Sequence, residues 1–340
     1  ATMHGAPLWA RTATVAAGPV FNFVLSIAVF AGIFWVNGVA TDAPTVGAVR
    51  AVPGIEAQLQ PGDRITGIGG QSTADFAAFL DAAGAMPDQA VVEYQVERGG
   101  QSMTLRDSHP LPPVVETVQP DSAARGAGVE PGDVVRTVDG VTVATFPQLR
   151  ELVGASEGKA LMLGLDRGGE ALERELLPRR VDLPLAEGGF ETRWLIGLTG
   201  AMYFEPETRQ PGPVEGIIMG AEQSWNIAAT SLSGLWHMVT GAISSCNLRG
   251  PIGIAETSGA AASAGLTSFI WFIAMLSTAV GMMNLFPVPV LDGGHLVFYA
   301  WEAVTGKPPT ARALRVLMTV GLAAILTLMV FALSNDLFCP

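Results

Sequence analysis

Three long stretches without a charged side chain constrain this sequence more than any other feature. No Asp, Glu, Lys or Arg occurs in residues 12–41, 257–291 or 316–335, which are 30, 35 and 20 residues long. A helix rises about 1.5 Å per residue, so about 20 mostly apolar residues cross the hydrocarbon core of a bilayer. The sequence therefore predicts three membrane-spanning helices, at 17–39, 266–286 and 316–334.

Composition excludes several other classes of protein. Apolar residues make up 49 % of the 340 residues and charged ones only 15 %, against about 25 % charged in an ordinary soluble domain. The net charge of −12 offers no basic surface, so we expect no nucleic-acid partner. Cys246 and Cys339 lie 93 positions apart and match neither a disulfide framework nor a zinc knuckle, so we expect both to be unpaired.

A fourth charge-free stretch, residues 223–248, differs from the other three in its polarity. Its 26 residues include 11 of Gln, Asn, Ser, Thr or His, whereas Trp225, Leu232 and Trp236 belong to an apolar set at helical spacing. One face is therefore apolar and the other polar. We expect an amphipathic helix within 214–248 that lies along the membrane surface.

The basic residues beside the predicted spans set the orientation. Arg11 precedes the first span, and Lys307, Arg312 and Arg315 lie between the last two. Because Lys and Arg in short loops favour the cytoplasm, the N-terminus and the connection before the last span should be cytoplasmic. Residues 40–213, with 14 basic and 25 acidic side chains, are then exported.

The exported part contains an internal duplication. The triplet Pro-Gly-Asp at 61–63 recurs 70 positions later at 131–133, and Arg-Gly-Gly at 98–100 recurs 69 positions later at 167–169. Each copy also contains a β-branched run, a Gly turn, a helical stretch and a hairpin signal. The duplication predicts two small β-rich domains, each with a helix.

These observations predict a multi-domain protein: a polytopic α-helical membrane protein with two inserted small β-rich domains. The bilayer is the first partner that this organisation implies. The expected parts are a cytoplasmic stub and first span (1–40), the two β-rich domains (41–110 and 111–183), a linker (184–213), the amphipathic helix (214–248) and the last two spans (249–340).

The sharpest local motif, Asn-Leu-Phe-Pro-Val-Pro-Val-Leu-Asp-Gly-Gly-His, occupies residues 284–295. Pro287 and Pro289 cannot continue a helix and push the residue before each toward extended geometry, so the chain should leave helical form here. Asp292 follows this interruption. Two interpretations of it remain open: a functional ionisable group inside the membrane, or the N-cap of a helix that runs to Val304.

The motif resembles the C-terminal signature of the site-2 protease family of intramembrane zinc metalloproteases. Residues 17–23 at the start of the first span, the β-rich pair, and Gly-Pro-Ile-Gly-Ile-Ala at 250–255 are similar to the regulator-of-sigma-E protease branch of that family. The β-rich pair resembles PDZ domains, most closely at 128–143. PDZ domains add an extended peptide to a sheet edge, so the pair could bind peptides or act only as a size filter. The resemblance covers essentially the whole chain in order.

This resemblance implies an endopeptidase of the bacterial inner membrane that holds Zn²⁺ and cuts single-pass membrane proteins such as anti-sigma factors. The PDZ-like domains would lie on the periplasmic side and make peptide or substrate contacts. Asp292 would be the third zinc ligand, and His295 would either orient the site or pack on its helix. The substrate strand would be held by an extended stretch with Asn284, Phe286, Pro287, Val288, Pro289 and Val290.

The sequence lacks the motif His-Glu-x-x-His that the family carries on an earlier span. Its two His bind zinc and its Glu is the general base. None of His4, His109, His237 and His295 belongs to such a motif. We expect the two His on a segment N-terminal to the printed sequence, and the printed chain alone to be inactive and to hold no stoichiometric zinc. The alternatives are a catalytically inactive, membrane-anchored PDZ adaptor or pseudoprotease, and a transporter with a broken helix at 284–294.

Overall fold

The structure is a computed structural model that describes residues 6–120, 122–185 and 189–339. It divides into two compact units. The helical unit comprises Ala1–Asn37, Pro184–Phe190 and Pro211–Pro340, and the β-rich unit comprises Gly38–Leu183 and Glu191–Gln210.

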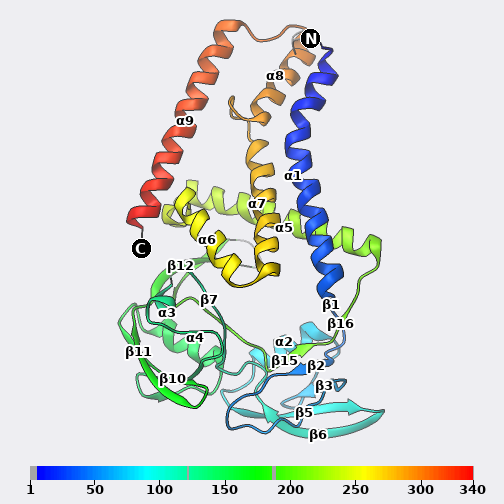
Figure 1. The fold of residues 1–340 in the computed structure, drawn as a ribbon, viewed down its shortest axis with the longest axis vertical. Coiled ribbons are helices and arrows are strands. Elements are labelled where there is room, and N and C mark those ends of the chain that lie inside the picture. The colour runs from blue at the N-terminus through cyan, green and yellow to red at the C-terminus, as the bar shows by residue number, and fades with distance from the viewer. Residues whose placement is uncertain (1–5, 121, 186–188, 340) are drawn as a thin grey trace. The chain divides into compact units, whose positions relative to one another are not determined.

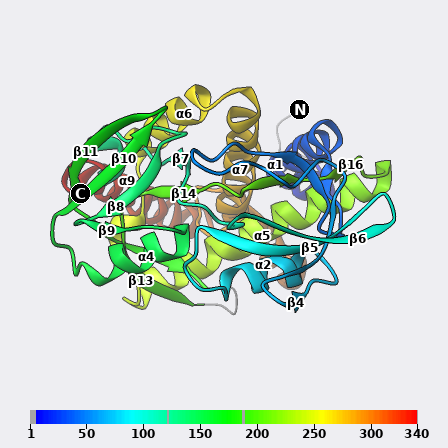
Figure 2. The same cartoon turned by 90° about the horizontal axis from the view of Figure 1, so that it is seen from below.

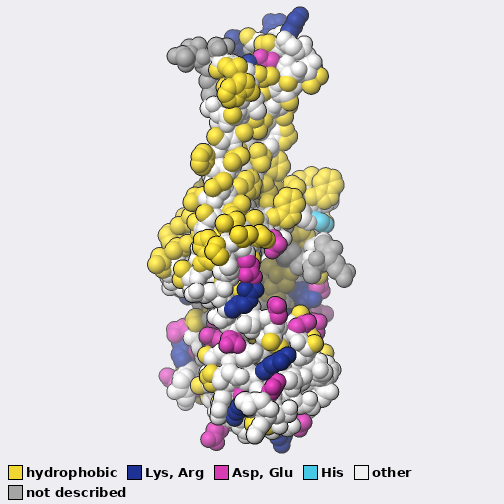
Figure 3. Space-filling model, turned by 90° about the vertical axis from the view of Figure 1, so that its right-hand side faces the viewer, with side chains coloured by type: hydrophobic (Ala, Val, Ile, Leu, Met, Phe, Trp, Pro, Cys, Tyr) yellow, Lys and Arg dark blue, Asp and Glu magenta, His cyan; other side chains and the backbone are white. Residues whose placement is uncertain are grey.

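Long helices make up most of the helical unit (Figure 1). Three of them, α1, α7 and α9, are long and apolar enough to cross a membrane, and they overlap the three predicted spans. Hydrophobic side chains cover most of the surface of this unit, whereas charged side chains are spread over the β-rich unit (Figure 3). The helices are α1 (Leu8–Asn37), α5 (Pro213–Val239), α6 (Pro251–Ser263), α7 (Leu266–Asn284), α8 (Asp292–Thr305) and α9 (Ala311–Phe338), with a short 3-10 turn, η2, at Ser245–Asn247.

Helix α5 crosses α1 and α7 at close range (Figure 1). At the crossing, the buried hydroxyls of Ser26, Ser224 and Thr278 lie within hydrogen-bonding distance of Ser26 Oγ. A Cβ at Gly220 would lie 2.6 Å from the Ile27 carbonyl oxygen, so only glycine allows this approach. Small residues and hydroxyls are the usual means by which helices pack where apolar burial gives no advantage. The amphipathic helix expected along the membrane surface corresponds to α5, whose position in a bilayer stays a prediction.

The C-terminal end of α9 is fastened to the segment before α6. Cys246 and Cys339 form a disulfide with their Cα atoms 5.6 Å apart, so the expectation of unpaired cysteines was wrong. The carboxylate of Asp336 accepts hydrogen bonds from the Gly250 and Ile252 amides (2.8 and 3.0 Å). A separation of 93 residues carries no information on proximity, which arises here only because α9 returns to the level of η2.

Two four-stranded antiparallel sheets with matching strand order form the body of the β-rich unit (Figure 2). The order is β4-β3-β5-β6 in the first copy and β9-β8-β10-β11 in the second, so the sequence repeat is also a structural repeat. The first copy contains β2 (Val46–Val49), β3 (Arg64–Ile68), β4 (Gln71–Ser72), α2 (Phe76–Gly84), β5 (Val91–Arg98) and β6 (Gln101–Ser108). The second contains β7 (Val115–Val118), α3 (Ala123–Gly126), β8 (Val134–Val138), β9 (Val141–Thr142), α4 (Phe146–Ala155), β10 (Leu161–Arg167) and β11 (Glu170–Leu176).

The stretch expected as a linker, 184–213, contains strands that complete both copies. Strand β14 pairs with β7 of the second copy, with Thr199 opposite Thr117, and β15 pairs with β2 of the first, with Glu205 opposite Ala48. Strands of two or three residues are too short to show an alternating pattern. The strands of this part are β12 (Arg179–Pro184), β13 (Phe190–Leu195), β14 (Leu198–Gly200), β15 (Phe204–Pro206) and β16 (Thr208–Arg209), which pairs with β1 (Val39–Ala40).

The repeated triplets meet in the structure as buried ion pairs. Asp133 is fully buried, and its two carboxylate oxygens accept hydrogen bonds from Nε and Nη2 of Arg167 (2.7 and 2.8 Å). Asp63 and Arg98 repeat this bidentate arrangement in the first copy, at 2.6 Å for both bonds. Each pair fastens a Pro-Gly-Asp turn to the end of a hairpin strand, which explains why both triplets recur at nearly the same offset.

Candidate active site

The segment between α7 and α8 leaves helical form at the predicted position. Helix α7 ends at Asn284 and α8 begins at Asp292, and in Figure 1 α8 continues in roughly the direction of α7. The segment between them is not extended as expected. The Val288 amide donates to the Phe286 carbonyl (2.7 Å) and the Leu291 amide donates to the Val288 carbonyl (2.8 Å), which makes two consecutive tight turns.

These turns are folded directly against the first turn of α8. A Cβ at Gly293 would lie 2.3 Å from the Leu285 carbonyl oxygen, and one at Gly294 would lie 2.2 Å from that of Val288. Real Cβ atoms do not approach so closely, so the two glycines after Asp292 allow the contact. The turns are compact because their backbone packs on these glycines. On α9, Gly321 faces the same segment, with a Cβ position 3.1 Å from Cδ of Pro289.

Asp292 lies half-buried in the helical unit, beside α1. A Cβ built on Gly18 would lie 3.0 Å from Oδ2 of Asp292, so the carboxylate faces this glycine. Gly18 is the eleventh residue of α1, which places this level about 15 Å along the helix from its first residue. The carboxylate is thus inside the bundle and not at its end.

The N-cap interpretation of Asp292 is contradicted. The N-cap of α8 is Leu291, which makes no side-chain capping bond, and Asp292 is the first helical residue. Among the residues that the structure describes, no group donates a hydrogen bond to the Asp292 carboxylate. A carboxylate half-buried in this way ordinarily has partners, so its oxygens are available to a cation.

The other predicted site residues surround this position along the chain. Asn284 is the last residue of α7, and its side chain is half-buried. Pro287 is exposed, whereas Phe286, Val288, Pro289 and Val290 are half-buried. The ring of His295, one turn into α8, lies edge-on to that of Phe298, with centroids 6.0 Å apart.

Sequence reasoning missed the glycines of this site. Gly18 makes room for the carboxylate, Gly293 and Gly294 for the turns, and Gly321 for the two residues before Leu291. The Gly-Gly pair directly after Asp292 and the Gly-Pro pair inside the first span were visible signals, since glycine costs about 1 kcal/mol in a helix and needs a packing reason.

The described residues provide one corner of a zinc site and not a complete one. Within residues 6–120, 122–185 and 189–339, no group of three or more His, Cys, Asp or Glu could hold a metal ion. His109 is buried in the β-rich unit, where burial lowers its pKa and its Nδ1 accepts the Leu111 amide (3.1 Å). His237 lies 2.7 Å from the Ser233 carbonyl on α5, and His4 lies outside the described residues. Catalytic zinc needs three protein ligands, of which Asp292 is a chemically suitable one.

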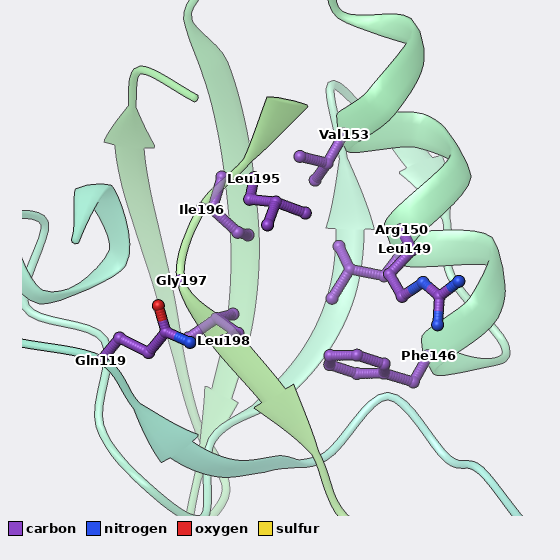
Figure 4. A pocket seen from close by; sticks show the side chains of 9 residues that line it. All are labelled: Gln119, Phe146, Leu149, Arg150, Val153, Leu195, Ile196, Gly197 and Leu198. Atoms are coloured by element: carbon purple, nitrogen blue, oxygen red, sulfur yellow. The ribbon is translucent and has the colours of Figure 1, made fainter. Parts of the chain in front are cut away.

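A groove runs along α4 in the second copy of the β-rich unit (Figure 4). Phe146, Leu149 and Val153 project from α4 toward the segment Leu195–Leu198, which forms the opposite wall. The groove continues toward Trp194 as an open cavity of about 460 Å³. One edge of β14 pairs with β7, so the groove lies beside a short sheet edge.

Comparisons with known proteins identify the class. The profile of "Peptidase family M50" matches residues 1–328. A protein of Rhizobium meliloti (strain 1021), provisionally named a zinc metalloprotease, is 35 % identical over 339 residues, which are 99 % of this chain and 72 % of that protein. The regulator of sigma-E protease RseP of Escherichia coli (strain K12) is 32 % identical over 356 residues, covering 96 % of this chain and 78 % of that protein.

These matches and the helical unit define a zinc metalloprotease of the membrane. The chain belongs to peptidase family M50, the site-2 proteases.

Solved structures give matches to parts of the chain. The PDZ domain of an SdrC-like protein from Listeria monocytogenes matches with 17 % identity and a TM-score of 0.22, over 26 % of this chain and 84 % of that one. A solution structure from Geobacillus thermodenitrificans matches with 24 % identity and a TM-score of 0.19, over 23 % of this chain and 86 % of that one.

Proposed function

We propose that this chain forms one wall of the active site of an intramembrane zinc endopeptidase, with Asp292 as a metal ligand. The carboxylate of Asp292 carries the proposal, because it is half-buried beside Gly18, caps no helix and accepts no hydrogen bond from the described residues. Zinc would polarise the peptide carbonyl and activate a water molecule. The two other protein ligands would be His residues of a further helix.

The substrate strand would lie beside Asn284 and the turns at 286–290. Non-helical backbone at membrane depth is stable only where protein or a wet cavity surrounds it, and a substrate strand needs such a place to unwind. We propose single-pass membrane proteins, anti-sigma factors among them, as substrates. His295, at the start of α8 and packed on Phe298, would hold the first turn of that helix in place.

Replacement of Asp292 tests this function. In the zinc-loaded enzyme that contains this chain, Asp292→Asn should abolish cleavage of a model single-pass substrate and lower the zinc content. The matched control is Glu256→Gln, which removes an exposed carboxylate on α6 and should leave both unchanged. Full cleavage by the Asp292→Asn enzyme would remove the basis of the proposal.

We further propose that the enzyme lies in the bacterial inner membrane with the β-rich unit in the periplasm. The chain enters the β-rich unit directly after α1, and the C-terminal ends of α1 and α9 lie at the same end of the helical unit (Figure 1). The Cys246–Cys339 disulfide is at that end of α9. Disulfides persist in oxidising compartments such as the periplasm, which supports this orientation.

The groove along α4 is the best candidate for the predicted peptide contacts. Its apolar wall and the adjoining edge of β14 suit an extended peptide that adds to a sheet. In a binding assay with fluorescent peptides ending in an apolar residue, Phe146→Ala should weaken binding to the full chain. Phe76→Ala, at the corresponding position 70 residues earlier, is the matched control and should not. Equal binding by both variants would favour a size filter over peptide binding.

A membrane-anchored adaptor or pseudoprotease is the second candidate. It is favoured by the absence of a metal-binding group among the described residues. Metal analysis and cleavage assays on the full-length protein separate the two candidates. One zinc per chain with cleavage supports the enzyme, and peptide binding without zinc or cleavage supports the adaptor.

A further inference from the structure

A second polar contact joins α1 and α8, near the opposite end of α8 from Asp292. Arg11 donates from Nη2 to Oε1 of Glu302 (2.7 Å) and from Nη1 to Oε2 (3.1 Å). The two side chains are only 17 % and 18 % exposed. The guanidinium also lies over the Tyr299 ring, 5.4 Å from its centroid, and its Nε donates to the Ala6 carbonyl (3.1 Å). Bidentate pairs of this kind fix direction as well as distance.

Together, the two contacts define how α8 is placed along α1. Arg11 precedes Gly18 by seven residues on α1, and Glu302 follows Asp292 by ten on α8. Because Arg11 meets Glu302 and Gly18 meets Asp292, the helices run in opposite directions and touch at two levels. Two contacts at different levels restrict both sliding and rotation of one helix against the other.

The charges on the two helices are also unequal. Helix α1 contains one charged residue, Arg11, and α8 contains two carboxylates, Asp292 and Glu302. Both amine nitrogens of the guanidinium bind Glu302. The cation of α1 is therefore committed at the far end of α8, and the Asp292 carboxylate faces a glycine instead of a positive side chain.

We infer that Arg11 and Glu302 are a positioning pair that holds the Asp292 carboxylate opposite Gly18 and keeps it free of a protein cation. This inference rests on the proposed role of Asp292. A slip of one residue between the helices moves the carboxylate by about 1.5 Å, whereas metal–ligand distances hold to about 0.2 Å. A small displacement of α8 is therefore enough to spoil the site while the fold persists.

A cysteine pair measures the placement directly, without zinc or activity. With Gly18→Cys and Asp292→Cys in the full-length protein, mild oxidation should join positions 18 and 292, identified by mass spectrometry of tryptic peptides. Arg11→Ala should slow this crosslink about tenfold, and the charge swap Arg11→Glu with Glu302→Arg should restore it to within about threefold. The control Arg315→Ala removes an exposed basic residue that flanks α9 and should leave the rate unchanged.

The same variants with Asp292 intact give the kinetic readout. Arg11→Ala should lower kcat about tenfold with KM nearly constant, and the swap should recover kcat. An unchanged crosslinking rate in Arg11→Ala, or a swap that performs no better than the single variants, would overturn the inference. Failure of the proposed function is distinguishable, because it appears as full activity of Asp292→Asn while the crosslinking result still reports the placement of α8.

Discussion

Removal of the Asp133 carboxylate should destabilise the second copy of the β-rich unit strongly. Asp133 is fully buried and accepts three hydrogen bonds, two from Arg167 and one from the Glu130 amide (2.9 Å). In Asp133→Ala, the guanidinium keeps the Gly128 carbonyl (2.8 Å) and the exposed Glu130 carboxylate (3.0 Å). It loses its main partner.

The size of the effect follows from this geometry. Breaking a buried ion pair on one side costs about 3–5 kcal/mol. The Arg167 side chain is 29 % exposed and can recover some hydration, which favours the lower end, about 3 kcal/mol. At about 1.4 kcal/mol per factor of ten, this raises the opening equilibrium more than a hundredfold.

Hydrogen exchange followed by mass spectrometry measures this opening in the full chain in micelles. Amides of β10 that are protected in the parent should exchange more than a hundredfold faster in Asp133→Ala, in line with about 3 kcal/mol. Glu130→Ala removes the 62 % exposed partner of the same arginine and should change the free energy by less than about 0.5 kcal/mol. Exchange in Asp133→Ala within threefold of the parent would refute the reasoning.

Three further predictions concern other parts of the chain. Burial would raise the pKa of Asp63 and of Asp133, but their arginine and amide partners outweigh it and hold both values below normal. Stability from these pairs should therefore be present above about pH 4 and fall as the pH drops toward the lowered pKa values, seen as faster exchange at pH 3 than at pH 6. Cys339→Ser should lower the free energy of unfolding by about 2 kcal/mol, measured by thermal denaturation in micelles; an unchanged midpoint would contradict it. Gly294→Ala should cost about 1–3 kcal/mol by forcing the turns off α8, and proteolysis at 285–291 should become faster than in Gly259→Ala, where a Cβ meets nothing.

The spans and the interruption at 284–292 were predictable from sequence because both depend on local properties. A run without charge defines a span whatever surrounds it, and two prolines stop a helix wherever they occur. The position of Asp292 after the interruption followed from the same motif, whereas its role as a ligand remains a prediction.

Contacts between distant residues could not be predicted in this way. The triplets at 61–63 and 98–100 were both visible, but nothing in the sequence showed that Asp63 binds Arg98. The strands β14 and β15 are too short to carry a pattern, and their partners lie about a hundred residues away. The disulfide was missed for the same reason, since two cysteines 93 positions apart give no indication of the level at which α9 ends.

The pairing of β1 with β16 has a mechanical consequence for this enzyme. Val39 lies opposite Arg209, so the strands by which the chain enters and leaves the β-rich unit form a single narrow stem. Helix α1 ends two residues before β1, and α5 begins four residues after β16. A force on the β-rich unit, such as the pull of a captured substrate, is therefore delivered at one point to both α1, which faces Asp292, and α5, which crosses it.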